Sequence, residues 1–224
     1  MAAKFALTYF PIPALGEPPR LLMALAGIDF IDNRVTGEAY QEVKKTAPLG
    51  QMPILTLPNG TVMTQCRAIS RYLAKLATVD GKLMYPEDPM EAYFCDEIMD
   101  ATMDVQRNMA KTFTMKGDEM VNARANLFNP DGGLCWEITT KLQTRIVAHG
   151  KKFTTSDSLN VGDIIFFTWM NSMRSGFLDH IPSTFLEAFP DLLARVDLIA
   201  SHPQVAAYYQ THKENKMYDC FQAK

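Results

Sequence analysis

The residues with the clearest chemical potential lie within Gly50–Leu73, where a proline, a turn and a polar pair follow one another. Pro53 lies between Met52 and Ile54 at the start of a short apolar run, so the Met52–Pro53 peptide bond is a candidate for the cis form. Such a bond would leave the backbone N–H and C=O of Met52 outside the sheet, where a bound peptide can pair with them like an added strand. The segment therefore predicts a peptide site, although an ordinary β-hairpin capped by a helix would explain the same residues.

The pair Gln65–Cys66 lies where a helix is expected to begin, ahead of apolar residues at helical spacing. The first N–H groups of a helix lack internal partners and carry partial positive charge, so they bind a carboxylate readily. Cys66 itself suggests a catalytic thiol, but a buried, inert cysteine is favoured, because the only basic residue close to it in sequence is Arg67.

These residues must be positioned by a strand, a helix and further strands in fewer than 80 residues. Alternating apolar side chains predict the first strand. The first helix is predicted from an apolar periodic run with prolines in its first turn and a glycine just after its end. Asn59–Gly60 between apolar runs predicts a hairpin. The predicted elements are strands 4–9, 28–35, 54–57 and 61–63, and helices 17–26, 39–45 and 66–74. The order predicts a small mixed sheet with helices on its faces.

The remainder of the chain is expected to be helical. Gly81, Pro86 and Pro89 interrupt any periodic structure, so residues 80–89 are interpreted as a linker between domains 1–79 and 90–224. Asn160 and Asp163 form a variant of the capping box ahead of a run that is apolar on nearly every side, which is typical of a helix inside a bundle. The predicted helices are 90–116, 117–126, 134–148, one from 160 onward, 186–200 and 203–212.

Bulk composition narrows the class of protein. The net charge of −3, with basic residues scattered, argues against a nucleic-acid partner. No apolar run approaches the length of a membrane span, and the N-terminus lacks a signal-peptide core. The four cysteines are widely spaced, which favours a cytoplasmic protein with free thiols, and no residue cluster has metal-ligand spacing.

Five motifs in this order resemble those of the cytosolic glutathione transferases that use a tyrosine, most closely the sigma class and next the pi class. The motifs are Tyr9–Phe10, Tyr40 with Lys44, Gly50–Pro53, Thr64–Ile69 and Asn160–Asp163. The resemblance implies an α/β thioredoxin-like N-terminal domain followed by an all-α C-terminal domain. It implies a cytoplasmic, homodimeric detoxification enzyme that uses glutathione as co-substrate and binds small electrophiles, with no metal, nucleic acid or membrane.

The resemblance also implies the roles of individual residues. Tyr9 would be catalytic, its hydroxyl donating to the glutathione sulfur. The glutathione-binding residues would be Tyr9, Tyr40, Lys44, Gln51, Met52, Pro53, Gln65, Cys66 and Asp104 of the partner subunit. The electrophile pocket would include Phe10, Ile12, Ala14, Leu15, Gln106 and Ala110.

Three departures from the family pattern keep alternatives open. Cys66 replaces the usual serine, Tyr40 replaces a tryptophan, and the loop after Tyr9 lacks the arginines often found there. The expected reaction is conjugation of the glutathione thiolate to electrophilic, mostly apolar substrates. The alternatives are a glutathione-dependent isomerase, like prostaglandin D synthase, or a non-catalytic ligand-binding or crystallin-like relative.

Overall fold

The computed structural model describes residues 4–223, and the chain forms two compact units, one ending at Tyr85 and one beginning at Pro86. The division falls inside the segment 80–89. Residues 1–3, on which the interpretation of the N-terminus partly depends, lie outside the described part. Among the described residues, no helix has both the length and the apolar composition that crossing a membrane requires.

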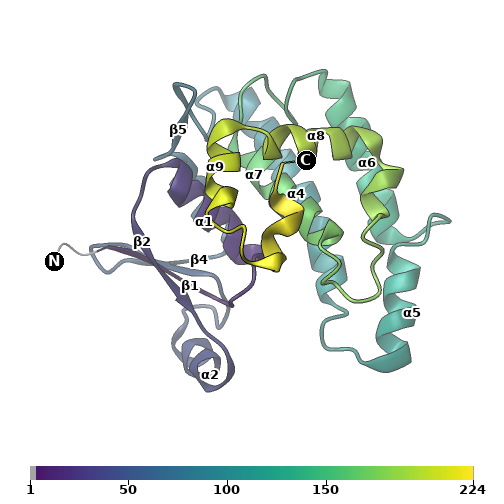
Figure 1. Ribbon diagram of the computed structural model, residues 1–224, viewed down its shortest axis with the longest axis horizontal. Coiled ribbons are helices and arrows are strands. Elements are labelled where there is room, and N and C mark those ends of the chain that lie inside the picture. The colour runs from purple at the N-terminus through teal and green to yellow at the C-terminus, as the bar shows by residue number, and fades with distance from the viewer. Residues whose placement is uncertain (1–3, 224) are drawn as a thin grey trace. The chain divides into compact units, whose positions relative to one another are not determined.

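Unit 1 is built on a four-stranded mixed sheet in the order β2-β1-β3-β4 (Figure 1). Strands β1 and β2 are parallel, so they need a helical crossover, whereas β3 is antiparallel to both β1 and β4. The strands are β1 (Phe5–Tyr9), β2 (Phe30–Arg34), β3 (Ile54–Thr56) and β4 (Val62–Thr64). This is the βαβ unit and hairpin that the sequence predicts.

Three α-helices accompany this sheet: α1 (Glu17–Leu25), α2 (Gly37–Thr46) and α3 (Cys66–Ala74). Helices α1 and α3 pack against each other, and their apolar residues Leu21, Leu22, Ile69 and Leu73 are fully buried. Helix α2 buries no residue fully and lies apart from α1 in Figure 1. Unit 1 therefore has its core on the α1–α3 side, and α2 is an exposed addition.

A second, two-stranded sheet formed by β5 (Thr78–Val79) and β6 (Lys82–Leu83) was not predicted, because this segment was interpreted as lacking regular structure. Asp80 and Gly81 both have positive φ, at 50° and 78°, as the two central residues of a type I′ turn require. The pair Asp-Gly was the overlooked cue for this hairpin.

Unit 2 is all-helical, which confirms the predicted fold class. Its helices are α4 (Pro89–Ala110), α5 (Gly117–Leu127), α6 (Leu134–His149), α7 (Val161–Arg174), α8 (Pro190–Ala200) and α9 (Pro203–Gln210), with the 3₁₀ turns η2 (Phe185–Ala188) and η3 (Lys216–Phe221). Helix α7 packs against α4 and α8, and residues 161–173 are buried on all sides, as the apolar run predicts.

Helix boundaries differ from prediction by more than two residues at two places. Helix α4 ends at Ala110 rather than at 116. At this observed end, the Thr112 hydroxyl donates to the carbonyl of Met109. The predicted helix 186–200 is interrupted before Pro190, because proline disfavours the helical conformation for the residue that precedes it. Phe189 accordingly has φ −126° and ψ 71°, outside the helical region. A short 3₁₀ turn precedes the break.

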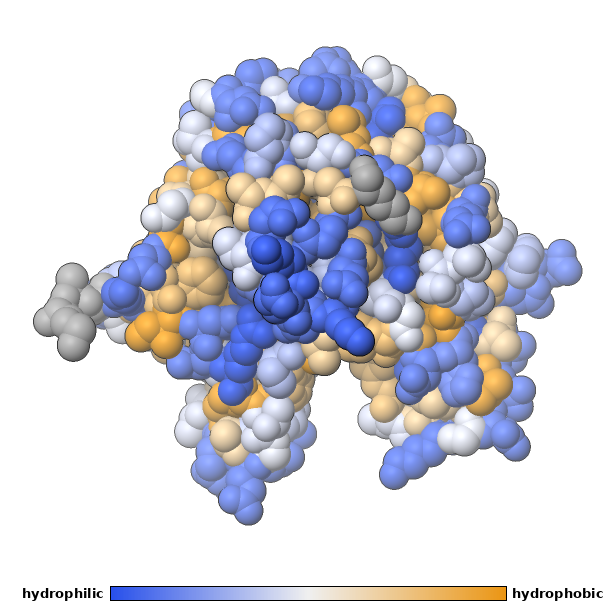
Figure 2. Space-filling view, in the orientation of Figure 1, coloured by the Kyte–Doolittle hydropathy of each residue, from blue (hydrophilic) through white to orange (hydrophobic). Residues whose placement is uncertain are grey.

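The C-terminal segment contributes both surface and core. Figure 2 shows hydrophilic residues gathered over the part that follows α9, where Lys213 and Glu214 are exposed. Just beyond them, Tyr218 and Phe221 of η3 are buried. The segment is therefore amphipathic, with its aromatic side fixed to unit 2.

Candidate functional site

The sheet register brings three of the predicted site segments to one end of unit 1. Thr8 pairs with Ile54, and Ile54 pairs with Thr64. One step further along these strands, Tyr9 and Gln65 flank Pro53, whose bond to Met52 is cis as predicted. Met52 itself lies just outside the sheet ladder.

The Tyr9 side chain is 5% exposed, and its surroundings define what its hydroxyl can do. The backbone N–H of Leu15 donates to the Tyr9 oxygen at 3.2 Å. Within residues 4–223, no group accepts the hydroxyl proton of Tyr9. Burial raises the pKa of Tyr9 above the usual tyrosine value, so the hydroxyl keeps its proton at neutral pH. The Tyr9 hydroxyl is therefore a fixed hydrogen-bond donor without an acceptor in the described part of unit 1.

Arg20 holds the loop that follows Tyr9. Its guanidinium donates to the carbonyl oxygens of Phe10 (3.1 Å) and Ile12 (2.8 Å) and forms an ion pair with Asp32 at 3.1 Å. Its central carbon also lies 5.8 Å from the centre of the Tyr9 ring. The carbonyl contacts could not be predicted from the sequence, since no side-chain pattern encodes a backbone acceptor.

Residues of the same loop were predicted to line the electrophile pocket. Phe10, Ile12, Ala14 and Leu15 are all half-buried, and Ala14 has φ 38°. The loop continues into the short turn η1 (Ala14–Gly16), where Gly16 is buried against the Tyr9 ring. Of these four residues, Phe10 and Leu15 contact Tyr9, the first through its ring and the second through its backbone N–H.

Tyr40 and Lys44 lie one helical turn apart on α2 and therefore share a face. The Tyr40 ring packs against Phe10, with ring centres 4.9 Å apart, which connects α2 to the loop after Tyr9. Lys44 is exposed, and no acidic group among the described residues pairs with it. In the part of the chain that the structure describes, Lys44 is therefore an unpaired cation at a position that the resemblance assigns to glutathione binding.

Gln65 precedes α3 with φ 72° and ψ 110°, which is unusual for a residue with a side chain. Backbone strain of this kind is concentrated at functional sites. The Gln65 amide nitrogen donates to Gln51 at 3.2 Å, so two predicted ligands of glutathione are in contact. Both side chains are exposed. Gln65 directly precedes the N-terminal end of α3, where the first backbone N–H groups of the helix have no partner within it.

Cys66 is the first residue of α3 and is 7% exposed. Burial raises the pKa of its thiol to about 12, so it is protonated at neutral pH. Only a thiolate is a strong nucleophile, so the structure supports the interpretation of Cys66 as an unreactive thiol.

The other predicted residues lie on α4 in unit 2. Asp104 forms an ion pair with Arg107 one turn along the helix, and its side chain is 45% exposed. Gln106 is 8% exposed, and Ala110 ends the helix half-buried. Among residues 4–223, no group of His, Cys, Asp or Glu side chains is arranged to hold a metal ion.

Comparison with known proteins gives a consistent result. Residues 17–76 match the family model for the glutathione S-transferase N-terminal domain, and residues 103–212 match that for the C-terminal domain. Glutathione S-transferase 4 of Caenorhabditis elegans is 29% identical over 95% of this chain and 98% of its own. Hematopoietic prostaglandin D synthase of Gallus gallus is 29% identical over 92% of this chain and 96% of its own. The solved structure of prostaglandin synthase D of Nilaparvata lugens has a TM-score of 0.79 at 25% identity. The match covers 92% of this chain and 97% of the solved one.

Proposed function

The chain belongs to the glutathione S-transferase family and is a glutathione transferase, and we propose that Tyr9 activates the glutathione thiol. The observation that carries this proposal is the Tyr9 hydroxyl, which accepts from Leu15 and retains a proton to donate. A donated hydrogen bond stabilises a thiolate relative to a thiol and lowers the pKa of the thiol. A free thiol of pKa about 8.5 is mostly protonated at neutral pH, so this shift supplies the nucleophile.

The reaction then follows from the thiolate. The thiol proton leaves to solvent, the sulfur attacks an electrophilic carbon, and a carbon–sulfur bond forms as the leaving group departs with its electron pair. Tyr9 stays protonated throughout, because burial already disfavours its anion. Its role is therefore electrostatic stabilisation of the sulfur anion rather than proton abstraction.

Glutathione would be held along its length by groups that unit 1 provides. Lys44 and Tyr40 would bind the glycine carboxylate, and the backbone of Met52 would pair with the cysteinyl segment. Gln65 and the first N–H groups of α3 would bind the γ-glutamyl carboxylate. The exposed, unpaired Lys44 and the contact between Gln51 and Gln65 support this assignment.

The test is Tyr9→Phe, which removes one oxygen. Conjugation of chlorodinitrobenzene should fall about 10²-fold, as expected when one donor to a developing anion is lost. Glutathione binding should survive, and the pH at which kcat/KM rises should move upward. Tyr72→Phe, on α3 and outside the proposed site, is the control. Unchanged turnover in Tyr9→Phe would remove Tyr9 from the mechanism.

A second candidate function is glutathione-dependent isomerisation of an endoperoxide. The similarity to two prostaglandin D synthases favours it, and the same Tyr9-activated thiolate would open the peroxide bond. Assaying both a chlorodinitrobenzene-type electrophile and a prostaglandin endoperoxide separates the two. Retention on glutathione-agarose without either turnover would instead favour a ligand-carrying relative.

The proposal extends to assembly and location. A homodimer would bring Asp104 of the partner subunit to the γ-glutamyl amine. None of the four cysteines, which all lie within residues 4–223, forms a disulfide, and this supports a reducing, cytoplasmic compartment. Sedimentation and fractionation measurements test these points.

A further inference from the structure

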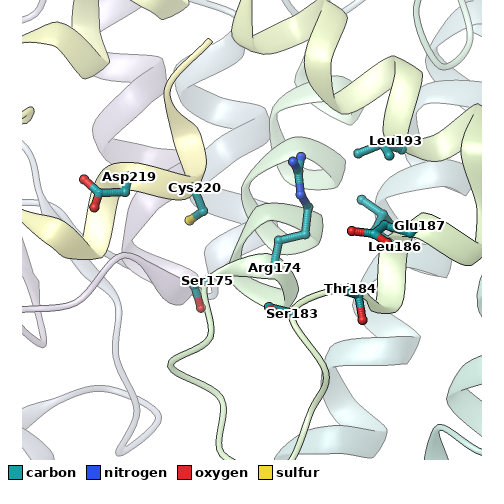
Figure 3. A pocket seen from close by; sticks show the side chains of 9 residues that line it. All are labelled: Arg174, Ser175, Ser183, Thr184, Leu186, Glu187, Leu193, Asp219 and Cys220. Atoms are coloured by element: carbon teal, nitrogen blue, oxygen red, sulfur yellow. The ribbon is translucent and has the colours of Figure 1, made fainter. Parts of the chain in front are cut away.

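Unit 2 contains a cleft of about 390 Å³ that none of the predicted site residues lines. Figure 3 shows it between the C-terminal end of α7, the segment leading into η2, and η3. Its volume suits a small molecule. Its lining is mostly charged or hydroxyl-bearing, and Leu186 and Leu193 supply the apolar part. A polar ligand with a small apolar group fits such a lining.

Arg174 provides a cationic edge inside this cleft. Its side chain is 10% exposed, and Figure 3 shows it reaching between Cys220 and Leu193. Its Nη1 donates to Asn171 Oδ1 at 3.4 Å and forms an ion pair with Asp197 Oδ1 at 3.3 Å. Within the described chain, no protein group accepts from its Nε or Nη2. That edge of a guanidinium binds a carboxylate through two parallel hydrogen bonds, so the cleft presents an unfilled carboxylate site.

Glu187 provides an anionic group in the same cleft. It lies on the Leu193 side of Arg174 in Figure 3, is exposed, and forms no ion pair with any cation of residues 4–223, Arg174 included. The other acidic residue of the lining, Asp219, points its carboxylate away from the remaining side chains. Arg174, whose Nη1 is paired with Asp197, and Glu187 share the cleft without pairing with each other. The Nε–Nη2 edge of Arg174 and the Glu187 carboxylate are together complementary to a ligand that carries both charges.

The wall formed by η3 is fixed in place, so this side of the cleft is preformed. Phe221 is 1% exposed and stacks on Tyr209 of α9, with ring centres 5.0 Å apart and planes at 13°. It also contacts Phe167 of α7 at 5.8 Å between ring centres. A preformed site loses little conformational entropy when a ligand binds.

We propose that this cleft binds a small aliphatic zwitterion of the α-amino acid class. The ligand carboxylate pairs with the Nε–Nη2 edge of Arg174, and the ammonium group faces Glu187. The aliphatic side chain packs on Leu186 and Leu193. This is a second ligand site, separate from the residues that bind and activate glutathione.

Titration calorimetry with three probes tests the charge requirement. L-leucine carries both charges, N-acetyl-L-leucine lacks the ammonium group, and 3-methylbutylamine lacks the carboxylate. With glutathione present at saturation, L-leucine should bind saturably with one site per chain, and the other two should bind at least tenfold more weakly. Absence of saturable heat with L-leucine up to its solubility limit, or its displacement by glutathione, would overturn the proposal.

Variants then locate the binding. Glu187→Gln changes an exposed side chain, so it should fold normally, weaken L-leucine about tenfold and leave N-acetyl-L-leucine unchanged. Glu119→Gln, an exposed acid on α5, is the matched control and should change nothing. Arg174→Lys keeps the charge but removes the planar edge, so it should weaken both probes. An equal loss of both probes in Glu187→Gln, or no loss of either, contradicts the assignment.

Discussion

Gly16 controls the position of the Tyr9 ring, because there is no room for a larger residue. A Cβ at Gly16 would lie 2.4 Å from Tyr9 Cδ1 and 2.7 Å from Cγ, well inside contact distance. The Gly16 backbone has φ −82° and ψ −20°, which any residue adopts, so the requirement for glycine is steric. The Leu15 N–H that orients the Tyr9 oxygen belongs to the neighbouring residue. Ring position and hydroxyl orientation are thus set by adjacent residues of one turn.

Gly16→Ala should therefore impair catalysis through Tyr9. Displacing the ring by about 1 Å is expected to lower kcat/KM by about 10²-fold, with a smaller effect on glutathione affinity. The measurement is a double-mutant cycle with Tyr9→Phe. In the Tyr9→Phe background, the alanine should cause little additional loss. Fully additive losses would show that Gly16 acts independently of Tyr9.

The Cys66 thiol should resist alkylation in the folded protein. With burial raising its pKa to about 12, the thiolate fraction at pH 7 is about 10⁻⁵. Brief iodoacetamide treatment at neutral pH, followed by peptide mass spectrometry, should leave Cys66 unmodified while Cys220, which is half-exposed, is labelled. In urea both should react. Labelling of Cys66 as fast as Cys220 in the native protein would contradict its assignment as an inert thiol.

At the scale of elements, the start of α7 is a polar cluster inside the core of unit 2. Asn160 and Asp163 cap the helix reciprocally, as the sequence predicts. Asp163 Oδ1 also accepts from the backbone N–H and the hydroxyl of Thr154, at 2.9 Å and 2.6 Å. Cys95 of α4 donates to Asn160 Oδ1 at 3.4 Å, which connects α4 to the same cap. These contacts join a loop and two helices.

Two opposing effects act on the Asp163 carboxyl. Hydrogen bonds from Thr154 and Asn160 favour its charged form, but complete burial outweighs them and raises its pKa to about 6. The folded state therefore binds a proton more tightly than the unfolded state, whose aspartate has a pKa near 3.9. The contribution to stability is fully present below about pH 4 and is lost as pH rises through about 6.

The prediction compares the wild type with Asp163→Asn, which has no charge at this position. The difference in free energy of unfolding, wild type minus variant, should fall by about 2 kcal/mol between pH 4 and pH 7. Other titrating groups cancel in this difference. Urea unfolding at a series of pH values provides the measurement. A difference that grows with pH would mean that the hydrogen bonds prevail over burial.

Local sequence cues predicted much of this element structure. The α7 cap, the hairpin at Asn59–Gly60 and the start of α3 each depend on a few neighbouring residues. The loop after Tyr9 could not be predicted in this way, because Arg20 holds it through carbonyl oxygens, which every residue has. The cleft at Arg174 likewise combines α7, α8 and the C-terminal segment, and no spacing in the sequence brings these together.

At the scale of the whole molecule, the proposed homodimer would build the glutathione site from more than one chain. Unit 1 supplies Tyr9, Lys44 and Gln65, whereas Asp104 belongs to unit 2 and is assigned to the glutathione of the partner subunit. Among residues 4–223, the only partner of the Asp104 carboxylate is Arg107, in an exposed ion pair. Exposed pairs of this kind contribute little to stability, so the Asp104 carboxylate is available to a stronger partner.

Asp104→Asn should therefore weaken glutathione binding about tenfold, the size expected for losing a hydrogen bond between charged groups near the surface. Asp118→Asn, an exposed acid at the start of α5, is the matched control and should bind like the wild type. Protein concentration separates a role across subunits from a role within one chain. Where sedimentation shows a dimer, the two variants should differ, and on dilution to monomers they should bind glutathione equally weakly. A tenfold difference that persists in the monomer would place Asp104 beside the glutathione of its own chain.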